Sequence, residues 1–169
     1  NETAIFTISS ITGNGQESGT QSLTLTIVEN ESTPTVTLTS SASSIAENSG
    51  SSLTLTATMS ATFSSDVTVT LSTSGTAVEG THYSNLSDIT ISAGNLTGTT
   101  TFTPTNNSIY DISNSATIDI NTVSGGILEN GTQQITISIS EDEAAPTATV
   151  SFTTPGSDHA ENSGGTYSA

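Results

Sequence analysis

The 169-residue chain lacks Lys, Arg, Cys and Trp altogether, and aromatic residues make up only 4% of it. Its 16 Asp and Glu residues therefore have no cationic side chain to pair with except two His, and the formal net charge is −16. Without basic side chains the chain cannot neutralise phosphates or anionic headgroups, so we expect no nucleic-acid partner. The absence of Cys excludes disulfides and zinc–sulfur sites, and the absence of Lys excludes Schiff bases, P-loops and Lys-based crosslinks. This balance is typical of a secreted or cell-surface protein.

Long apolar runs and targeting signals are also absent. No stretch of about 18 apolar residues occurs, which predicts no direct insertion into a membrane. The chain starts at Asn1 without an initiator Met, a signal peptide or a sorting motif, so we expect it to be part of a longer polypeptide.

Ser and Thr are abundant, at about 65 residues. A hydrophobic content of 31% with a high net charge lies close to the composition of disordered chains. The pattern argues against disorder, because apolar residues alternate with Thr or Ser in 53–59, 67–71 and 135–139. Alternation with β-branched Thr is typical of half-buried antiparallel strands, and no window shows the 3.6-residue period of a helix. The sequence therefore predicts an all-β fold.

The sequence repeats itself at an offset of 112 residues. The matching segments are 17–21 (Glu-Ser-Gly-Thr-Gln) with 129–133 (Glu-Asn-Gly-Thr-Gln), and 29–31 (Glu-Asn-Glu) with 141–143 (Glu-Asp-Glu). The sequence Ala-Glu-Asn-Ser-Gly occurs at 46–50 and again at 160–164, an offset of 114. We interpret the chain as a tandem array.

This periodicity predicts three units: residues 1–33 are the C-terminal part of a preceding repeat, 34–145 a complete repeat, and 146–169 the N-terminal part of a following repeat. Within the complete repeat, strands are expected near 34–39, 52–60, 66–73, 88–92, 98–104, 115–121 and 132–140. Seven short strands in such a length indicate an immunoglobulin-like, seven-stranded antiparallel β-sandwich. The predicted core is Val36, Leu38, Leu53, Leu55, Val67, Val69, Leu71, Ile89, Ile91, Phe102, Ile118, Ile120, Ile135, Ile137 and Ile139. The flanking parts are too short to form sandwiches, so we expect them to pack on neighbouring repeats of the same protein or on identical chains.

Several pieces of the complete repeat, in their order and spacing, resemble the Calx-β domain. They are Ala-Glu-Asn-Ser-Gly at 46–50, Gly-Thr-Ala-Val-Glu-Gly-Thr-His-Tyr at 75–83, Phe-Thr-Pro-Thr-Asn-Asn-Ser-Ile-Tyr-Asp at 102–111, and Glu-Asp-Glu at 141–143. That family is named for the calcium-sensing domains of sodium/calcium exchangers, and it recurs in tandem in large bacterial surface adhesins. The resemblance covers the whole of 34–145.

The resemblance implies a calcium site at one end of the sandwich. The matched positions are Glu47, Asn106, Asn107, the backbone carbonyl of Ile109, Asp111, Glu141, Asp142 and Glu143. The chain departs from the family pattern at three places: His82 stands where Asp is preferred, Asn106 and Asn107 replace acidic residues, and Ser113 and Asn114 stand where further carboxylates are common.

The residues themselves give an independent argument for a cation. Three carboxylates adjoin at 141–143, and carboxylates about 5 Å apart repel one another by about 1 kcal/mol even in watery surroundings. Calcium would reverse this repulsion by gathering oxygen ligands, and at this position it would stiffen the junction with the next repeat. The alternative is a solvated acidic linker that keeps the repeats soluble.

We find no catalytic constellation and expect no enzyme. Asp158 and His159 follow Ser157 directly, an arrangement in which adjacent side chains do not form a triad, and no Gly-x-Ser-x-Gly motif occurs. The glycines at 13–15 and 125–126 are interpreted as turn residues.

The sequence thus favours a structural stalk or filament repeat of a secreted bacterial cell-surface adhesin, serving attachment, biofilm formation or gliding motility. One alternative is an adhesion module whose loops bind a carbohydrate or protein on a surface or cell. Another is a calcium sensor, against which Asn106 and Asn107 argue. Cadherin-like repeats are an alternative for the fold.

Overall fold

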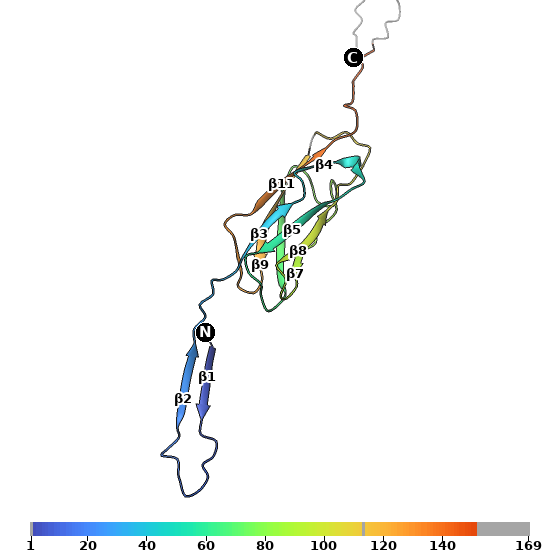
Figure 1. Ribbon diagram of the computed structural model, residues 1–169. Coiled ribbons are helices and arrows are strands. Elements are labelled where there is room, and N and C mark those ends of the chain that lie inside the picture. The colour runs from blue at the N-terminus through green and yellow to red at the C-terminus, as the bar shows by residue number, and fades with distance from the viewer. Residues whose placement is uncertain (1, 113, 152–169) are drawn as a thin grey trace, which may run out of the picture.

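The computed structural model describes residues 2–112 and 114–151, which form a β-hairpin followed by a β-sandwich (Figure 1). The all-β prediction is confirmed: the only helical element in these ranges is a single 3-10 turn, η1 (Glu47–Ser49). None of the described residues belongs to a helix that is long and apolar enough to span a membrane. The sequence match at 160–164, the residues 157–159 and most of the unit predicted at 146–169 lie outside the described residues.

The sandwich consists of two sheets that face each other. The first has the strand order β10 (Leu128–Glu129), β3 (Thr35–Ser40), β5 (Leu53–Met59), β8 (Thr97–Phe102). The second has the order β4 (Ser44–Ala46), β11 (Gln134–Ser140), β9 (Asn114–Val123), β6 (Val67–Gly75), β7 (Ile89–Ile91). Neighbouring strands are antiparallel except for the pairs β10–β3 and β4–β11, which are parallel. All the strands predicted in this unit are present, and the immunoglobulin-like sandwich is confirmed.

Two short strands, β4 and β10, are not predicted by the alternation. The chain crosses from the first sheet to the second between β3 and β4, where Ser41 N donates to Thr54 O and Ser138 N donates to Ser43 O, each at 2.9 Å. β4 has three residues and β10 has two, and runs this short carry no readable period of two.

The core contains almost all the residues predicted to point inward. β5 shows the pattern directly, because its Leu, Ala and Met residues are buried while its Thr residues are exposed or half-buried. Leu71 and Ile135 were predicted to be buried, and they are only partly buried, packed against the edge of the core. The buried hydrophobic residues that are absent from the predicted core are Ile45, Ala57, Met59, Ala77, Tyr83, Ala116 and Ile127.

The alternation does not identify Tyr83, because this residue lies in the connection between β6 and β7. Tyr83 forms one isolated bridge to Glu79, within the connection, and another to Pro104, which follows β8. The Tyr83 ring is fully buried and stacks on Phe102, with ring centroids 4.6 Å apart. Burial raises the pKa of the Tyr83 hydroxyl. A loop residue therefore closes one end of the core.

The hairpin is made of β1 (Glu2–Thr7) and β2 (Ser22–Ile27), and it stands apart from the sandwich (Figure 1). The chain enters the sandwich at the end nearest the hairpin and leaves it after β11 at the opposite end (Figure 1). Entry and exit at opposite ends suit a module that is connected in series.

We expect Gly98→Ala to destabilise the sandwich, because Gly98 lets β8 approach β7 of the other sheet. A Cβ at this position would lie 2.3 Å from the carbonyl oxygen of Thr90, which is backbone and cannot rotate away. Overpacking of this kind costs about 1–3 kcal/mol. Urea unfolding should show the loss, whereas Thr99→Ala at an exposed position of the same strand should change stability by less than about 0.5 kcal/mol. Equal effects of the two substitutions would contradict this packing.

Candidate metal centre

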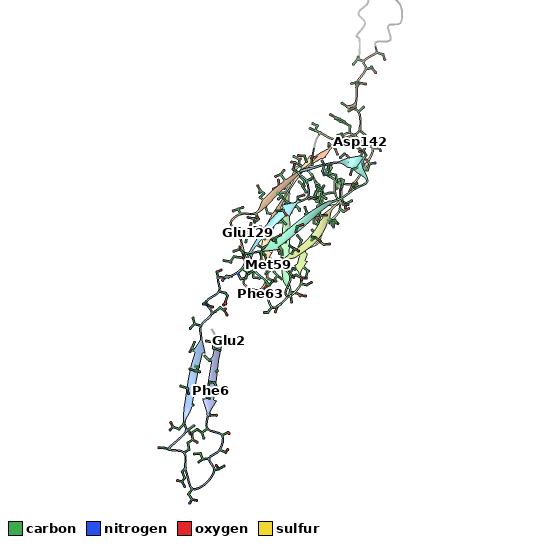
Figure 2. All side chains as sticks on the ribbon, in the orientation of Figure 1. Glu2, Phe6, Met59, Phe63, Glu129 and Asp142 are labelled. Atoms are coloured by element: carbon green, nitrogen blue, oxygen red, sulfur yellow. The ribbon has the colours of Figure 1, made fainter. Side chains whose placement is uncertain are left out.

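Four carboxylates meet at the end of the sandwich where the chain leaves it. They are Glu47, Glu141, Asp142 and Glu143, and one oxygen from each lies within 4.8 Å of the others. Figure 2 shows Asp142 at this end, while Met59 and Phe63 lie toward the end that faces the hairpin.

Parallel pairing of β4 with β11 creates this meeting. Ala46, the last residue of β4, lies opposite Ser140, the last residue of β11. Because the two strands run in the same direction, the residues that follow them leave the sheet side by side. Glu47 and Glu141 are those residues, so two segments 94 positions apart in the sequence deliver their carboxylates to one place.

Glu47 is held by the loop that precedes β9. Its side chain is only 7% exposed, and it is the one buried charged residue among those described. Its Oε1 accepts hydrogen bonds from the backbone N of Asn107 (2.7 Å) and from Asn107 Nδ2 (2.6 Å). A buried carboxylate is costly unless it is hydrogen-bonded, and these two donors offset part of that cost.

Glu141 is oriented by backbone N–H groups. Its Oε2 accepts from the backbone N of Asp111 at 2.7 Å, and its Oε1 accepts from the backbone N of Asp142 (3.1 Å) and of Glu143 (3.3 Å). Asp142 is exposed, and its Oδ2 accepts from Asn48 Nδ2 at 2.8 Å. Asn48 was not predicted to contribute to the site, although it directly follows Glu47 in the Ala-Glu-Asn-Ser-Gly segment.

Glu143 and Glu141 behave as one carboxyl pair. Hydrogen bonding to the Glu143 carboxyl, together with the Asp111 backbone N–H, lowers the pKa of Glu141 to about 2. Hydrogen bonding to Glu141, followed by desolvation and the charge of Asp142, raises the pKa of Glu143 to about 7. The Oε2 atom of Glu143 is buried and has no hydrogen-bond partner among the described protein groups. Near neutral pH, Glu143 therefore retains a proton for part of the time, because two adjoining carboxyls do not ionise together easily.

The remaining predicted ligands do not belong to the group of four carboxylates. Asn107 turns its amide nitrogen toward Glu47, and its Oδ1 accepts from the backbone N of Ile109 at 2.7 Å, so its side chain positions Glu47. Asn106 and Ile109 have exposed side chains in the same loop. Ser113 lies outside the described residues, and Asn114 begins β9, where it pairs with Ile139.

Asp111 is linked to His82, the residue that stands where the resembled family prefers Asp. His82 Nε2 lies 3.3 Å from Asp111 Oδ2. His82 Nδ1 accepts from the backbone N of Val78 at 2.7 Å, which places the imidazole proton on Nε2, facing the carboxylate. Asp111 thus supports Glu141 through its backbone while its side chain is held by His82.

This donor set fits a hard divalent cation. Every atom that the cluster offers is a carboxylate oxygen, the ligand type of calcium and magnesium, and the chain has no Lys or Arg to neutralise it. A cation would also give the isolated Oε2 of Glu143 a partner. Without a cation, the arrangement is four acidic groups restrained by backbone and amide donors.

No family model matches the chain, and no curated protein matches it in sequence. Among solved structures it is similar to the apo form of the Calx CBD1 domain, with a TM-score of 0.52 and 17% identity over 64% of this chain and 98% of that one. It is also similar to the calcium binding domain CBD12 of CALX1.1, with a TM-score of 0.51 and 18% identity over 59% of this chain and 42% of that one, so it spans less than half of that structure. The resemblance to Calx-β domains is confirmed at the level of the fold.

In the presence of a chelator, we expect the stability of the sandwich to fall as the pH rises from about 5 to about 8. The pKa of Glu143 is about 7 in the folded protein and 4.5 ordinarily, so the folded state binds more protons in this range. The stabilisation is complete below the ordinary pKa and is lost as the pH rises through the raised one. The lowered pKa of Glu141 acts only at more acidic pH.

Urea unfolding midpoints across this range would measure the effect. Glu143→Gln, which cannot titrate, should flatten the profile, whereas Asp88→Asn, at an exposed position outside the cluster, should leave it unchanged. A flat profile for the unsubstituted chain would show that Glu141 and Glu143 do not share a proton.

Proposed function

We propose that this chain is a calcium-binding structural repeat from the stalk of a secreted bacterial cell-surface adhesin, in which calcium stiffens the junctions between repeats. The observation that carries the proposal is the group of four carboxylates within 4.8 Å at the point where the chain leaves the sandwich. Similarity in fold to Calx domains, one of which is described as a calcium binding domain, supports it.

Calcium would be held by Glu47, Glu141, Asp142 and Glu143. When bound, it supplies two positive charges and accepts oxygen ligands, so it replaces mutual repulsion with attraction. Asn107 and the Asp111 backbone keep Glu47 and Glu141 in place beforehand, which reduces the ordering that binding requires.

The mechanical effect follows from where these residues lie. Glu47 belongs to the body of the sandwich, next to β4, whereas Glu141, Asp142 and Glu143 are the first residues of the chain that leaves β11. A cation shared by both would tie the outgoing chain to the body. Without a cation, the like charges favour movement of the outgoing chain away from Glu47. Calcium would thus convert a flexible connection into a stiff one.

The connection before the sandwich carries a related acidic pair. Glu29 and Glu31 follow β2 at the positions that correspond to Glu141 and Glu143. Their carboxyls are also coupled, but in the opposite sense: hydrogen bonding to Glu31 raises the pKa of Glu29, and hydrogen bonding to Glu29 lowers the pKa of Glu31. An acidic pair after the last strand at both junctions supports a role between repeats.

An adhesion module that binds ligand through its loops is the second candidate. A groove of about 670 Å³ lies at the hairpin end of the sandwich, beside Phe63, Gly125, Ile127 and the connecting residues Glu29 and Glu31. Phe63 is the only aromatic residue in its lining, and its ring covers Gly125 at the base of a turn. Carbohydrate recognition commonly requires exposed aromatic faces, so the stalk proposal is preferred.

Thermal unfolding in calcium and in excess chelator tests the calcium component. A ligand that binds only the folded state adds about 2.7 kcal/mol at a free concentration a hundredfold above its Kd, so the midpoint should rise clearly in calcium. The combined substitution Glu47→Gln and Asp142→Asn should abolish the rise, because it removes one carboxylate from each of the two segments.

Asp66→Asn and Asp88→Asn are matched controls, since each removes a carboxylate at an exposed position outside the cluster. Both should retain the calcium-dependent rise. An unchanged midpoint at millimolar calcium, or a rise that survives the Glu47 and Asp142 substitutions, would overturn the assignment of this cluster as the calcium site.

A further inference from the structure

One exposed face of the hairpin carries only apolar side chains, apart from Glu2 at its end. In the pairing of β1 with β2, Phe6 lies opposite Leu23 and Ala4 lies opposite Leu25, so these side chains share a face. Ile27, opposite Glu2, extends the same face. Phe6 and Leu23 are 57% and 58% exposed, and Figure 2 shows Phe6 on the hairpin, away from the sandwich. An isolated two-stranded hairpin is marginal in water, and an apolar patch of this kind marks an interaction surface.

β1 and β2 pair in the same register as β9 and β11. Phe6 opposite Leu23 becomes Ile118 opposite Ile135 when 112 is added to both numbers, and every other pair of β1 and β2 is reproduced in the same way. Register is fixed by which residues must face a core, so identical register implies the same buried face.

The loops that join the paired strands also agree in detail. Gln21 donates from its backbone N to Glu17 Oε1, and Gln133 donates from its backbone N to Glu129 Oε1. The turn glycines with positive φ correspond as well: Gly13 (+89°) with Gly125 (+74°), and Gly19 (+72°) with Gly131 (+69°). The hairpin is therefore the same structural unit as the closing hairpin of the sandwich.

In the sandwich, this unit is covered by strands that all come from residues 35–102. Ile118 and Ile137 of the closing hairpin are fully buried in the core shared with the first sheet. The outer edge of β11 pairs with β4 in parallel, and the outer edge of β9 pairs with β6 in antiparallel orientation. The equivalent face and both equivalent edges of β1 and β2 have none of these strands around them (Figure 1).

We propose that the apolar face of β1 and β2 is a docking surface for a stretch of polypeptide with the strand pattern of residues 35–102, joined ahead of Asn1, which completes a second sandwich. Asn1 corresponds to residue 113, so a segment that ends at the equivalent of residue 112 continues directly into the hairpin. The proposal rests on the repeat organisation in the proposed function but not on calcium.

A second copy of the hairpin would cover the apolar face less completely than a segment with the strand pattern of residues 35–102. Two hairpins packed face to face would bury their apolar residues, but each would keep two unpaired outer edges. The edge of β2 corresponds to the edge of β11, which takes a parallel partner, and the edge of β1 corresponds to the edge of β9, which takes an antiparallel one. A segment that carries the equivalents of β4 and β6 satisfies both.

The test adds a copy of residues 34–112 ahead of Asn1 of the full chain and follows amide hydrogen exchange at 2–7 and 22–27. We expect exchange at these amides to slow by about a hundredfold or more relative to the unextended chain, approaching that of β9 and β11. The same extended chain with Phe6→Ser and Leu25→Ser should lose this protection, while the sandwich at 34–145 keeps its own. Hairpin amides that exchange equally fast with and without the extension would overturn the proposal, as would protection of the unextended chain that grows with its concentration.

A second variant avoids dependence on the added segment. In the full chain, residues 113–145 are replaced by a copy of residues 1–33, which has the same length and the same register. This chain should unfold cooperatively, with strand amides protected as in the original sandwich, and loss of cooperative folding would overturn the proposal. Both experiments are carried out in chelator, so their outcome is independent of whether calcium binds at Glu47 and Glu141.

Discussion

Repulsion among carboxylates that the protein cannot neutralise with cationic side chains dominates the end of the sandwich where the chain leaves it. The parallel pairing of β4 with β11 brings Glu47 beside Glu141, Asp142 and Glu143, and the chain has no Lys or Arg to place among them. Backbone and amide donors restrain Glu47 and Glu141, while Glu143 responds with a raised pKa and an oxygen that lacks a partner. A divalent cation bound here would relieve the repulsion and give this oxygen a partner, at the point where the chain leaves the sandwich.

Much of the fold could be predicted because alternation in an antiparallel sheet is a local signal. The Thr-separated apolar residues of β5, β6 and β11 are read directly from the sequence, and the sandwich has them facing the core. β4 and Tyr83 could not be found in this way. β4 is a three-residue strand defined by its partner, and Tyr83 is buried by the loop that folds over the end of the core.

The four carboxylates of the candidate site could be predicted from the sequence, but the hydrogen bonds that hold them could not. Glu47 and Glu141 to Glu143 were identified through resemblance and charge density, and the structure brings them together. The amide orientation of Asn107 and the donor Asn48 depend on contacts between segments far apart in the chain, which periodicity does not report. The 112-residue offset in the sequence predicts that the hairpin corresponds to β9 and β11. The structure shows that the two pairs of strands also share the same register. The chain enters the sandwich at one end and leaves it at the other (Figure 1), and an acidic pair follows β2 and another follows β11, as the proposed rod would require.

Backbone NMR relaxation of the full chain would show whether a cation ties the outgoing chain to the body of the sandwich. Heteronuclear NOE values for residues 141–146 would be recorded in calcium and in chelator. We expect these residues to be as rigid as β11 in calcium and to become mobile on the nanosecond timescale in chelator, while β9 and β11 stay unchanged. Values for 141–146 that are the same in both conditions, in a sample shown to bind calcium, would contradict this expectation.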